Sequence, residues 1–326
     1  MITGFALIFS SCQLENEVPV CNYNIQLEYW SAENTVQNEL PMYVRKIDEY
    51  IFDNKGVLFM INRIDKDRCT RQLRAEYTLP PGNYSVVSWG NCDSVSRVSE
   101  ATPGVTTLSE MQLRQERKPG QESHPMSEDI YYGFRTFSVP ETGVGRTRVV
   151  MSHAYLLLDI TIRWKSKTPD NTKNFSITFE QTHDRYPFLP HYMVRSGYVW
   201  PFDLTDEEYN ERDISHRYYL MNRHPGAKVV NQRKEVTMDI TRSISARFTA
   251  YRISNNSHPI LRLYAGDQPL MKEIDLYKFF SQMGIELDMN LRQEFFLLIE
   301  IDGDKVTVMP MIFSDWINGG EIGGQI

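Results

Sequence analysis

Residues that could carry out chemistry are few in this chain and are widely spaced. The seven histidines form no His-Glu-x-x-His pattern, and none stands beside a second ligand at the spacing that a metal site needs. Phosphate-binding loops, dinucleotide fingerprints and the Gly-x-Ser-x-Gly turn of hydrolases are also missing from the sequence. We therefore expect neither an enzyme nor a protein that needs a metal ion or an organic cofactor.

Two short segments look like fragments of metal sites, and each has a simpler explanation. His183-Asp184 with His191 could hold a cation, but ordinary surface hydrogen bonding explains these side chains better. Asp302-Gly-Asp304 matches part of a calcium loop, but Lys305-Val-Thr307 follows where further ligands should stand. This second segment is more typical of a hairpin turn.

One aromatic cluster is a candidate for binding sugar. Tyr186, Tyr192, Tyr198 and Trp200, together with Phe188, lie in a region that is crowded with Tyr, His, Pro and Arg and shows no hydrophobic periodicity. Aromatic faces stack on pyranose rings, so these four side chains are possible glycan contacts. The alternative is that they pack a long loop onto a sheet, since buried aromatic rings contribute much of a core.

The cysteine with the most informative context is Cys12. A short apolar run, residues 4–9, and two serines precede it, and the chain turns polar directly after it. This order is typical of a bacterial lipoprotein signal, in which the cysteine becomes the first mature residue and carries acyl chains. Each buried methylene contributes roughly 0.8 kcal/mol, so several chains form a firm anchor. This segment departs from a usual signal peptide in two ways, since its apolar run is short and no Lys or Arg precedes Arg45. The alternative to a lipoprotein signal is that these residues form a buried strand in which Cys12 is a core cysteine.

Three other cysteines remain, namely Cys21, Cys69 and Cys92. No two cysteines are three residues apart, as zinc and redox motifs require. Export to an oxidising compartment would permit one disulfide. The sequence does not select the pair, although Cys69 and Cys92 lie on what look like neighbouring strands and are our candidates.

Composition indicates a globular protein of two domains. The chain has 326 residues, of which 41% are hydrophobic. Beyond the N-terminus, no apolar run approaches the roughly 18 residues that a membrane-spanning helix needs. The net charge is -7 and the basic residues are scattered, which argues against a nucleic-acid partner.

Strand patterns dominate the first half. Ile25, Leu27 and Tyr29 alternate with polar residues, which predicts a strand with one buried face. Residues 43–52 and 57–61 flank a turn that contains Gly56 and should form a hairpin. Residues 77–90 have the same form, with two prolines and Gly82-Asn83 at the turn. The polar segment 93–125 is expected to be a long surface loop with one weakly helical piece near 108–113. Strands at 129–133 and 147–151 are expected to complete the first set of strands.

The second half begins with a mostly apolar run, residues 155–164, which predicts a central strand covered on both faces. Residues 271–283 carry apolar side chains at helical spacing before Gly284, so one amphipathic helix is expected. A capping-box pattern at 205–208 indicates another short helix. Further strands are expected at 175–179, 235–240, 243–253, 260–264, 294–301 and 306–316.

These patterns predict an all-β protein with one or two short helices. Many short strands separated by turns favour antiparallel sandwiches, and two of them in tandem fit the length. The expected divisions are a signal and tether over residues 1–20, an N-terminal sandwich over 21–152 and a C-terminal sandwich over 153–326.

Several of these segments together resemble the FimB-like fimbrial anchorage family of Bacteroidales. The resemblance covers nearly the whole chain, in order, and its most specific part is the Pro-Gly-x-Tyr and Trp-Gly stretch within residues 79–91. The other segments that carry it are Cys12, the strand after Cys21, residues 50–58, 129–133 and 301–304.

The resemblance implies two transthyretin-like, Greek-key sandwiches held in the outer membrane by the lipid on Cys12, at the base of a fimbrium. Such a protein would anchor the fibre and limit its length, with fimbrial shaft subunits (pilins) as partners. Subunits of these fibres join by donor-strand exchange, and the candidate contact is the last strand, or a groove in either sandwich. The alternative is a cell-surface adhesin or glycan-binding lipoprotein of the same fold. The candidate strand-exchange residues are Val306, Val308, Ile312 and Trp316.

Overall fold

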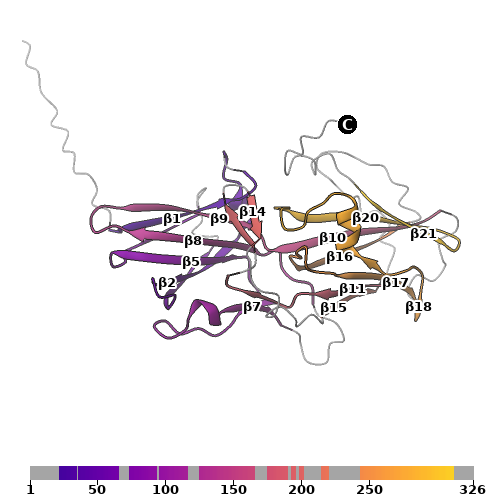
Figure 1. Cartoon of the computed structure of the whole chain (residues 1–326), viewed down its shortest axis with the longest axis horizontal. Helices are drawn as coiled ribbons and strands as arrows, with labels where there is room; N and C mark the ends of the chain where they lie inside the picture. The colour runs from indigo at the N-terminus through magenta and orange to yellow at the C-terminus, as the bar shows by residue number, and fades with distance from the viewer. Residues whose placement is uncertain are drawn as a thin grey trace, which may run out of the picture.

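The computed structural model is an elongated molecule in which two lobes of strands lie end to end (Figure 1). The only α-helices among the described residues are α1 (Leu40–Tyr43) and α2 (Leu276–Gln282), which confirms the all-β fold class. The structure describes residues 22–34, 36–65, 73–93, 95–116, 125–165, 175–189, 192–195, 198–201, 214–219 and 243–311.

The first lobe is built on one seven-stranded sheet with the strand order β3-β2-β5-β8-β9-β1-β4. Neighbouring strands are antiparallel except β1 and β9, which run parallel. The bounds are β1 (Ile25–Ser31), β2 (Lys46–Phe52), β3 (Leu58–Asp65), β4 (Arg74–Tyr77), β5 (Gly82–Gly90), β8 (Tyr131–Val139) and β9 (Gly145–His153).

Two predictions for this sheet are confirmed. Ile25, Leu27 and Tyr29 on β1 are fully buried, as their alternation indicated. β2 and β3 form the expected hairpin. Its turn is fixed because the Asp53 carboxylate accepts the N–H of Val57, and Gly56 adopts a positive φ of 76° that favours glycine.

The expected hairpin within residues 77–90 is wrong. β4 pairs with β1 at one end of the sheet, whereas β5 pairs with β2 and β8 nearer the other end. The side chain of Asn24 fastens the connection, since its amide donates to the Leu79 carbonyl (2.7 Å) and its oxygen accepts the Leu79 N–H (2.9 Å). The prolines at 80 and 81 end β4 as predicted, but they carry the chain to a different part of the sheet.

The polar segment 93–125 is not only a surface loop. It contributes β6 (Ser96–Val98) and β7 (Gln112–Gln115), and a short 3₁₀ helix, Leu108–Glu110, lies between them. Met111 and Leu113 are fully buried. β7 lies at the centre of a three-stranded sheet with β6 and with β12 (Arg185–Pro187), a strand from the later half of the chain.

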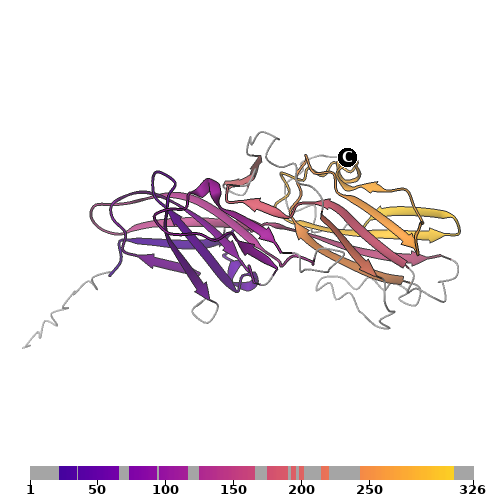
Figure 2. The same cartoon turned by 90° about the horizontal axis from the view of Figure 1, so that it is seen from below.

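The second lobe contains two sheets that enclose a second core (Figure 2). β10 has neighbours on both sides, as predicted, and eight of its ten residues are buried. One sheet has the order β16 (Ser243–Tyr251), β10 (Tyr155–Trp164), β20 (Gln293–Asp302) and β21 (Lys305–Pro310). The other has the order β15 (Ile214–Tyr219), β11 (Phe175–Thr182), β17 (Ile260–Ala265) and β18 (Gln268–Pro269), and β19 (Ile274–Asp275) also pairs with β17.

The predicted helix at 271–283 exists but begins later, because Ile274 pairs with Leu261 as a strand residue. Asp275 then caps α2, since its carboxylate accepts the N–H of Lys278 at 3.1 Å. Gly284 follows the helix with a φ of 73°, as expected of a C-terminal glycine. The helix expected at 205–208 and the strand expected at 235–240 lie outside the described residues.

Two clusters of buried hydrophobic residues form the cores of the two lobes. Between His153 and Tyr155 the chain passes from β9 of the first lobe to β10 of the second. The domain boundaries 21–152 and 153–326 stay predictions. Side chains from beyond residue 152 also pack into the core of the first lobe. Tyr186, Phe188 and Tyr251, which follow the expected boundary, are buried in the first cluster.

A candidate strand-exchange edge

The last described strand, β21, lies at the edge of its sheet. It pairs with β20 along residues 305–310, and among the described residues no other strand pairs with it. The turn before it, Asp302–Lys305, contains Gly303 at a φ of 60°, so the calcium-like triplet is a hairpin turn as expected. An edge strand presents unpaired N–H and C=O groups that an added strand can bind.

An open groove lies beside β21, between it and the edge of the facing sheet. The groove has a volume of about 720 Å³ and is lined mainly by apolar side chains. All of these side chains except the exposed Pro269 are partly buried and pack on the second core, so the groove is a gap at the open side of the sandwich. The apolar lining consists of Pro269, Leu270, Met271, Ile274, Val306 and Val308.

The groove is open because the facing sheet has an interrupted edge. β18 and β19 each contain two residues, and residues 270–273 separate them. The turn at Gly266 (φ 58°) starts β18, and the Leu270 N–H still donates to the Leu263 carbonyl at 2.8 Å. Sequence reasoning assigned this wall to a helix face. The signal that could have identified it is the turn glycine followed closely by Pro269.

Charged side chains stand at the rim of the groove. Lys272, Glu273 and Asp304 line it together with the apolar residues. Arg262 fixes Glu273, because its guanidinium Nη2 lies 2.7 Å from the Glu273 carboxylate, and it also contacts Glu180. The hydrogen bonds that Arg262 donates to Glu273 and to the second carboxylate, Glu180, raise the pKa of Arg262, so this cation stays charged. The rim is therefore polar and the floor apolar.

Such an edge suits the addition of a β-strand. The backbone of β21 offers a row of hydrogen bonds, and alternate side chains of an incoming strand could fill the apolar groove. Of the predicted strand-exchange residues, Val306 and Val308 are brought together on one wall of the groove. Ile312 and Trp316 lie outside the described residues.

The structure describes one of the predicted covalent sites in part. Cys92 is buried, with 6% of its surface exposed, and burial raises the pKa of its thiol. Its candidate partner Cys69 and the candidate lipidation residue Cys12 lie outside the described residues. The disulfide and the lipid anchor stay predictions.

Tyr186 does not fit the expected glycan contact. Its side chain is 1% exposed, and its ring lies against those of Trp89 and Tyr251, with centroids 5.9 Å and 4.9 Å away. Packing against the protein occupies the ring faces that a sugar would need, which corrects the prediction for this residue. The other three candidates lie on a hairpin of β13 (Tyr192–Arg195) and β14 (Tyr198–Pro201), where the structure describes only the backbone.

The candidate metal cluster is not assembled in the part of the chain that the structure describes. His183 is buried, and its Nε2 lies 2.8 Å from the Ser257 hydroxyl, while His191 is outside the described residues. No group of three or more His, Cys, Asp or Glu residues is placed to hold a metal ion among the described residues.

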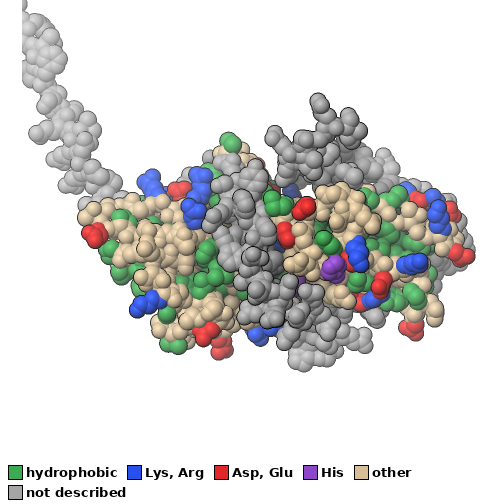
Figure 3. All heavy atoms as spheres, viewed as in Figure 1, with side chains coloured by type: hydrophobic (Ala, Val, Ile, Leu, Met, Phe, Trp, Pro, Cys, Tyr) green, Lys and Arg blue, Asp and Glu red, His purple; other side chains and the backbone are tan. Residues whose placement is uncertain are grey.

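Neither the surface charge nor the hydropathy of the described residues points to a further binding site. On the face that Figure 3 shows, blue Lys and Arg side chains lie scattered among red acidic ones and form no continuous stripe. Within the residues that were described, no helix has the length and apolar character needed to cross a bilayer.

Comparison with known families gives one match over most of the chain. The family described as fimbrillin-A associated anchor proteins Mfa1 and Mfa2 matches residues 17–319. No curated protein matches the chain.

Three solved structures share the fold. A suspected adhesin from Bacteroides ovatus has a TM-score of 0.65 at 15% identity, covering 89% of this chain and 94% of its own. A suspected polysaccharide-binding protein from Bacteroides thetaiotaomicron has a TM-score of 0.63 at 13% identity, covering 90% and 99%. The fimbrial anchor protein Mfa2 from Porphyromonas gingivalis has a TM-score of 0.60 at 16% identity, covering 87% and 94%.

Proposed function

We propose that this chain, which belongs to the family of fimbrillin-A associated anchor proteins, fixes fimbriae to the outer membrane through a lipid on Cys12. The expected membership in a fimbrial anchor family is confirmed, and the family consists of structural fimbrial proteins and not of a known class of enzyme. The observation that carries the proposal is the edge of β21, which no other described strand pairs with, beside an apolar groove.

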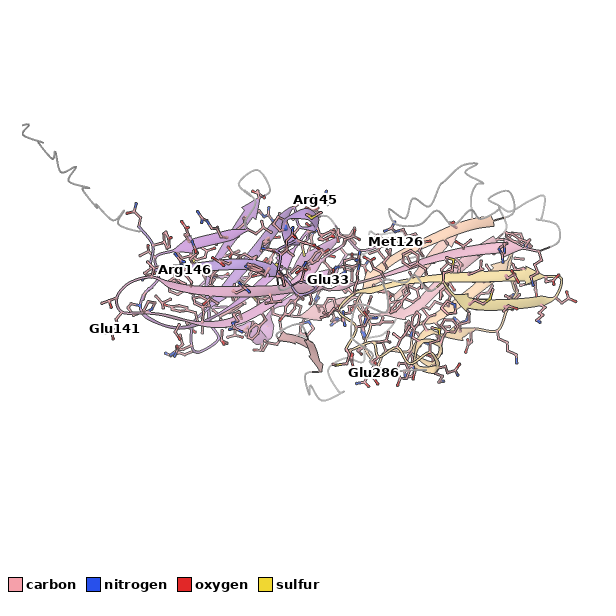
Figure 4. All side chains as sticks on the ribbon, turned by 90° about the horizontal axis from the view of Figure 1, so that it is seen from above. Glu33, Arg45, Met126, Glu141, Arg146 and Glu286 are labelled. Atoms are coloured by element: carbon pink, nitrogen blue, oxygen red, sulfur yellow. The ribbon has the colours of Figure 1, made fainter. Side chains whose placement is uncertain are left out.

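The lipid would act at one end of the molecule and the fibre at the other. The described chain begins at the end of the first lobe where Figure 4 labels Glu141 and Arg146. Cys12 precedes the first described residue by ten positions, which span at most about 35 Å when extended. The β21 edge lies at the opposite end of the long axis (Figure 1). This arrangement suits a tether that stands between a membrane and a fibre.

Strand exchange at the β21 edge would join the anchor to a pilin. A pilin strand with apolar side chains at alternate positions could cover Val306 and Val308, and its backbone could pair with β21. The chain could equally give its own last strand to a pilin, because that strand lies at the same edge. In both cases the fibre would end at the membrane, which accounts for a limit on its length.

Deletion of the gene tests this proposal. We expect fibres that detach into the medium or grow beyond their normal length, because their base is no longer held. Complementation with the intact gene should return attached fibres of normal length. Fibres that stay attached and keep their length after deletion would contradict the anchoring role.

The second candidate function is that of an adhesin or glycan-binding lipoprotein. The observation that favours it is the fold shared with a suspected adhesin and a suspected polysaccharide-binding protein. Burial of Tyr186 removes one of the four proposed contacts, which leaves Tyr192, Tyr198 and Trp200 as candidates. A glycan array probed with the purified chain separates the two functions. Specific sugar binding together with intact fibres in the deletion strain would support the adhesin.

A further inference from the structure

A segment from the later half of the sequence is built into the first lobe. Residues 184–188, which we name the strap, lie against β7, with Tyr186 opposite Leu113. Two backbone hydrogen bonds extend this pairing: the Gln115 N–H donates to the Asp184 carbonyl (2.8 Å) and the Phe188 N–H donates to the Met111 carbonyl (3.1 Å). Only one residue, His183, separates the strap from the end of β11 in the second lobe, so the strap connects the two lobes directly.

Aromatic packing buries the strap. The Phe188 ring is fully buried and contacts the rings of Tyr50, Phe52 and Trp89, with centroids 4.9 to 6.3 Å away. The hydroxyl of Tyr132, from β8, donates to the Phe188 carbonyl at 2.8 Å. Full burial of a Phe side chain contributes a large hydrophobic free energy, and edge-on ring contacts add to it.

The hydroxyl of Tyr186 reaches the crossing between the lobes. It lies 3.0 Å from the carbonyl oxygen of Ala154 and 3.2 Å from that of Arg252. Ala154 separates β9 from β10, and the Arg252 N–H donates to the Ala154 carbonyl at 3.1 Å. One phenol therefore ties the strap to the β9–β10 connection and to the end of β16 in the second lobe.

The side chain of Arg252 fastens this crossing to the second lobe. It is 2% exposed, and its guanidinium donates to the carbonyl oxygens of Leu287 (3.0 Å), Asp288 (3.3 Å) and Asn290. The loop that supplies these carbonyls leads into β20. A buried cation surrounded by oriented carbonyls holds its neighbours firmly, because breaking any one bond leaves a polar group buried without its partner.

Two polar contacts flank the joint, one within each lobe, and a third crosses it. Glu33, which Figure 4 labels near the meeting of the lobes, lies 3.0 Å from Nε2 of His153. The Tyr155 hydroxyl donates to Glu294 at 3.0 Å. The Ser127 N–H donates to the Thr249 carbonyl at 2.9 Å, next to Met126.

We propose that the strap and Arg252 form a clamp that makes the two lobes one mechanical and folding unit. Lobes joined by a small polar interface normally move against each other. Here a paired strand, a buried aromatic cluster and a buried arginine cross the boundary. The clamp joins the lobe that contains β1 to the lobe that contains β21, so a pull along the molecule loads it together with the β9–β10 connection. This inference is independent of the lipid and of the identity of the partner.

Calorimetry of the purified full chain tests the clamp. The unchanged protein should unfold in one transition whose calorimetric and van't Hoff enthalpies agree. Phe188→Ala should split the unfolding into two transitions, because the lobes then melt separately. The matched control is Phe280→Ala, a fully buried Phe of the second core stacked on Phe295, which should lower the midpoint without splitting the transition.

A milder variant keeps the test decisive if Phe188→Ala fails to fold. Tyr186→Phe retains the ring and removes only the hydroxyl at the crossing, so it should fold and its calorimetric enthalpy should exceed its van't Hoff enthalpy. Under a pulling force along the long axis, this variant should extend in two steps where the unchanged protein extends in one. Two transitions in the unchanged protein, or a single concerted transition in both strap variants, would overturn the clamp.

Discussion

The hydroxyl of Tyr77 donates a hydrogen bond to the carboxylate of Glu49 across the interior of the first lobe. Tyr77 lies on β4, at one end of the seven-stranded sheet, and Glu49 lies on β2, next to the strand at the other end. The sheet is therefore curled so that its two ends face each other. Tyr29 also donates to Glu49, as does Asn62 at 2.6 Å, and burial raises the pKa of the carboxyl.

Removing the Glu49 carboxylate should destabilise the protein strongly. Glu49→Ala leaves the buried hydroxyl of Tyr29 and the partly buried donors of Tyr77 and Asn62 without this acceptor, which we expect to cost about 3 kcal/mol of unfolding free energy. Urea unfolding followed by tryptophan fluorescence measures this difference. Ile64→Val, a small change in the same core, is the control and should cost about 1 kcal/mol. An equal loss in both variants would show that the polar cluster has no special role.

The same carboxyl should make stability depend on pH. Its folded-state pKa lies above the unfolded value of roughly 4.3 because burial disfavours the charged form. The protonated group therefore contributes stability that is complete below the unfolded pKa and is lost as pH rises through the folded pKa. Glu49→Gln cannot ionise, so its stability relative to the unchanged protein should rise with pH across that window. Urea unfolding at several values between pH 4 and pH 8 measures this, and a difference that stays constant with pH would count against it.

A charge in the groove should weaken the binding of a pilin strand. Val308→Lys places an ammonium on the apolar wall, whereas Thr307→Lys places the same group on the opposite face of β21, opposite Glu300. We expect at least about a tenfold loss of affinity for the first variant and little change for the second. Surface plasmon resonance with the purified pilin measures both. Equal affinities for the two variants would exclude the groove as the contact.

Loss of the cap at Asp275 should loosen α2 and the groove wall beside it. Asp275→Ala removes the hydrogen bond to the Lys278 N–H (3.1 Å) and the contact with His258 (2.9 Å), which we expect to cost about 1 kcal/mol. Asp275→Asn keeps a capping oxygen and should recover most of this loss. Thermal unfolding monitored by circular dichroism compares them, and an Asn variant as unstable as the Ala variant would show that capping is not the cause.

Local patterns predicted the strands whose residue types show directly which of their faces are buried. The alternation at Ile25, Leu27 and Tyr29 and the apolar run 155–164 each gave a strand, because burial of one or both faces is written into the residue types. The turns that contain Gly56 and Gly303 were also predicted correctly from their residue types. The pairing of β4 with β1 was not predictable, since register between distant strands is set by packing and not by neighbouring residues.

The functional regions were less accessible to sequence reasoning. β7 has the sequence Gln-Leu-Arg-Gln, whose polar residues concealed the buried Leu113. Packing of the aromatic cluster onto a sheet was the alternative to sugar binding, and it holds for Tyr186. The pairing of the strap with β7 was not predicted, because contact between segments far apart in the chain is a tertiary effect. The groove was half predicted: Val306 and Val308 were candidates, but helical spacing through residues 271–283 concealed the strand at Ile274. A period that fits a helix for two turns can also arise where a short strand leads into a capped helix.

Replacement of Cys12 by Ala in cells that make fimbriae is the decisive test of lipid anchoring. We expect the protein to leave the membrane fraction, to incorporate no labelled palmitate, and to release its fibres into the medium. A Cys92→Ala variant is the control, and it should keep both the label and the attached fibres. A Cys12→Ala protein that still takes up palmitate and holds fibres on the cell would contradict the account.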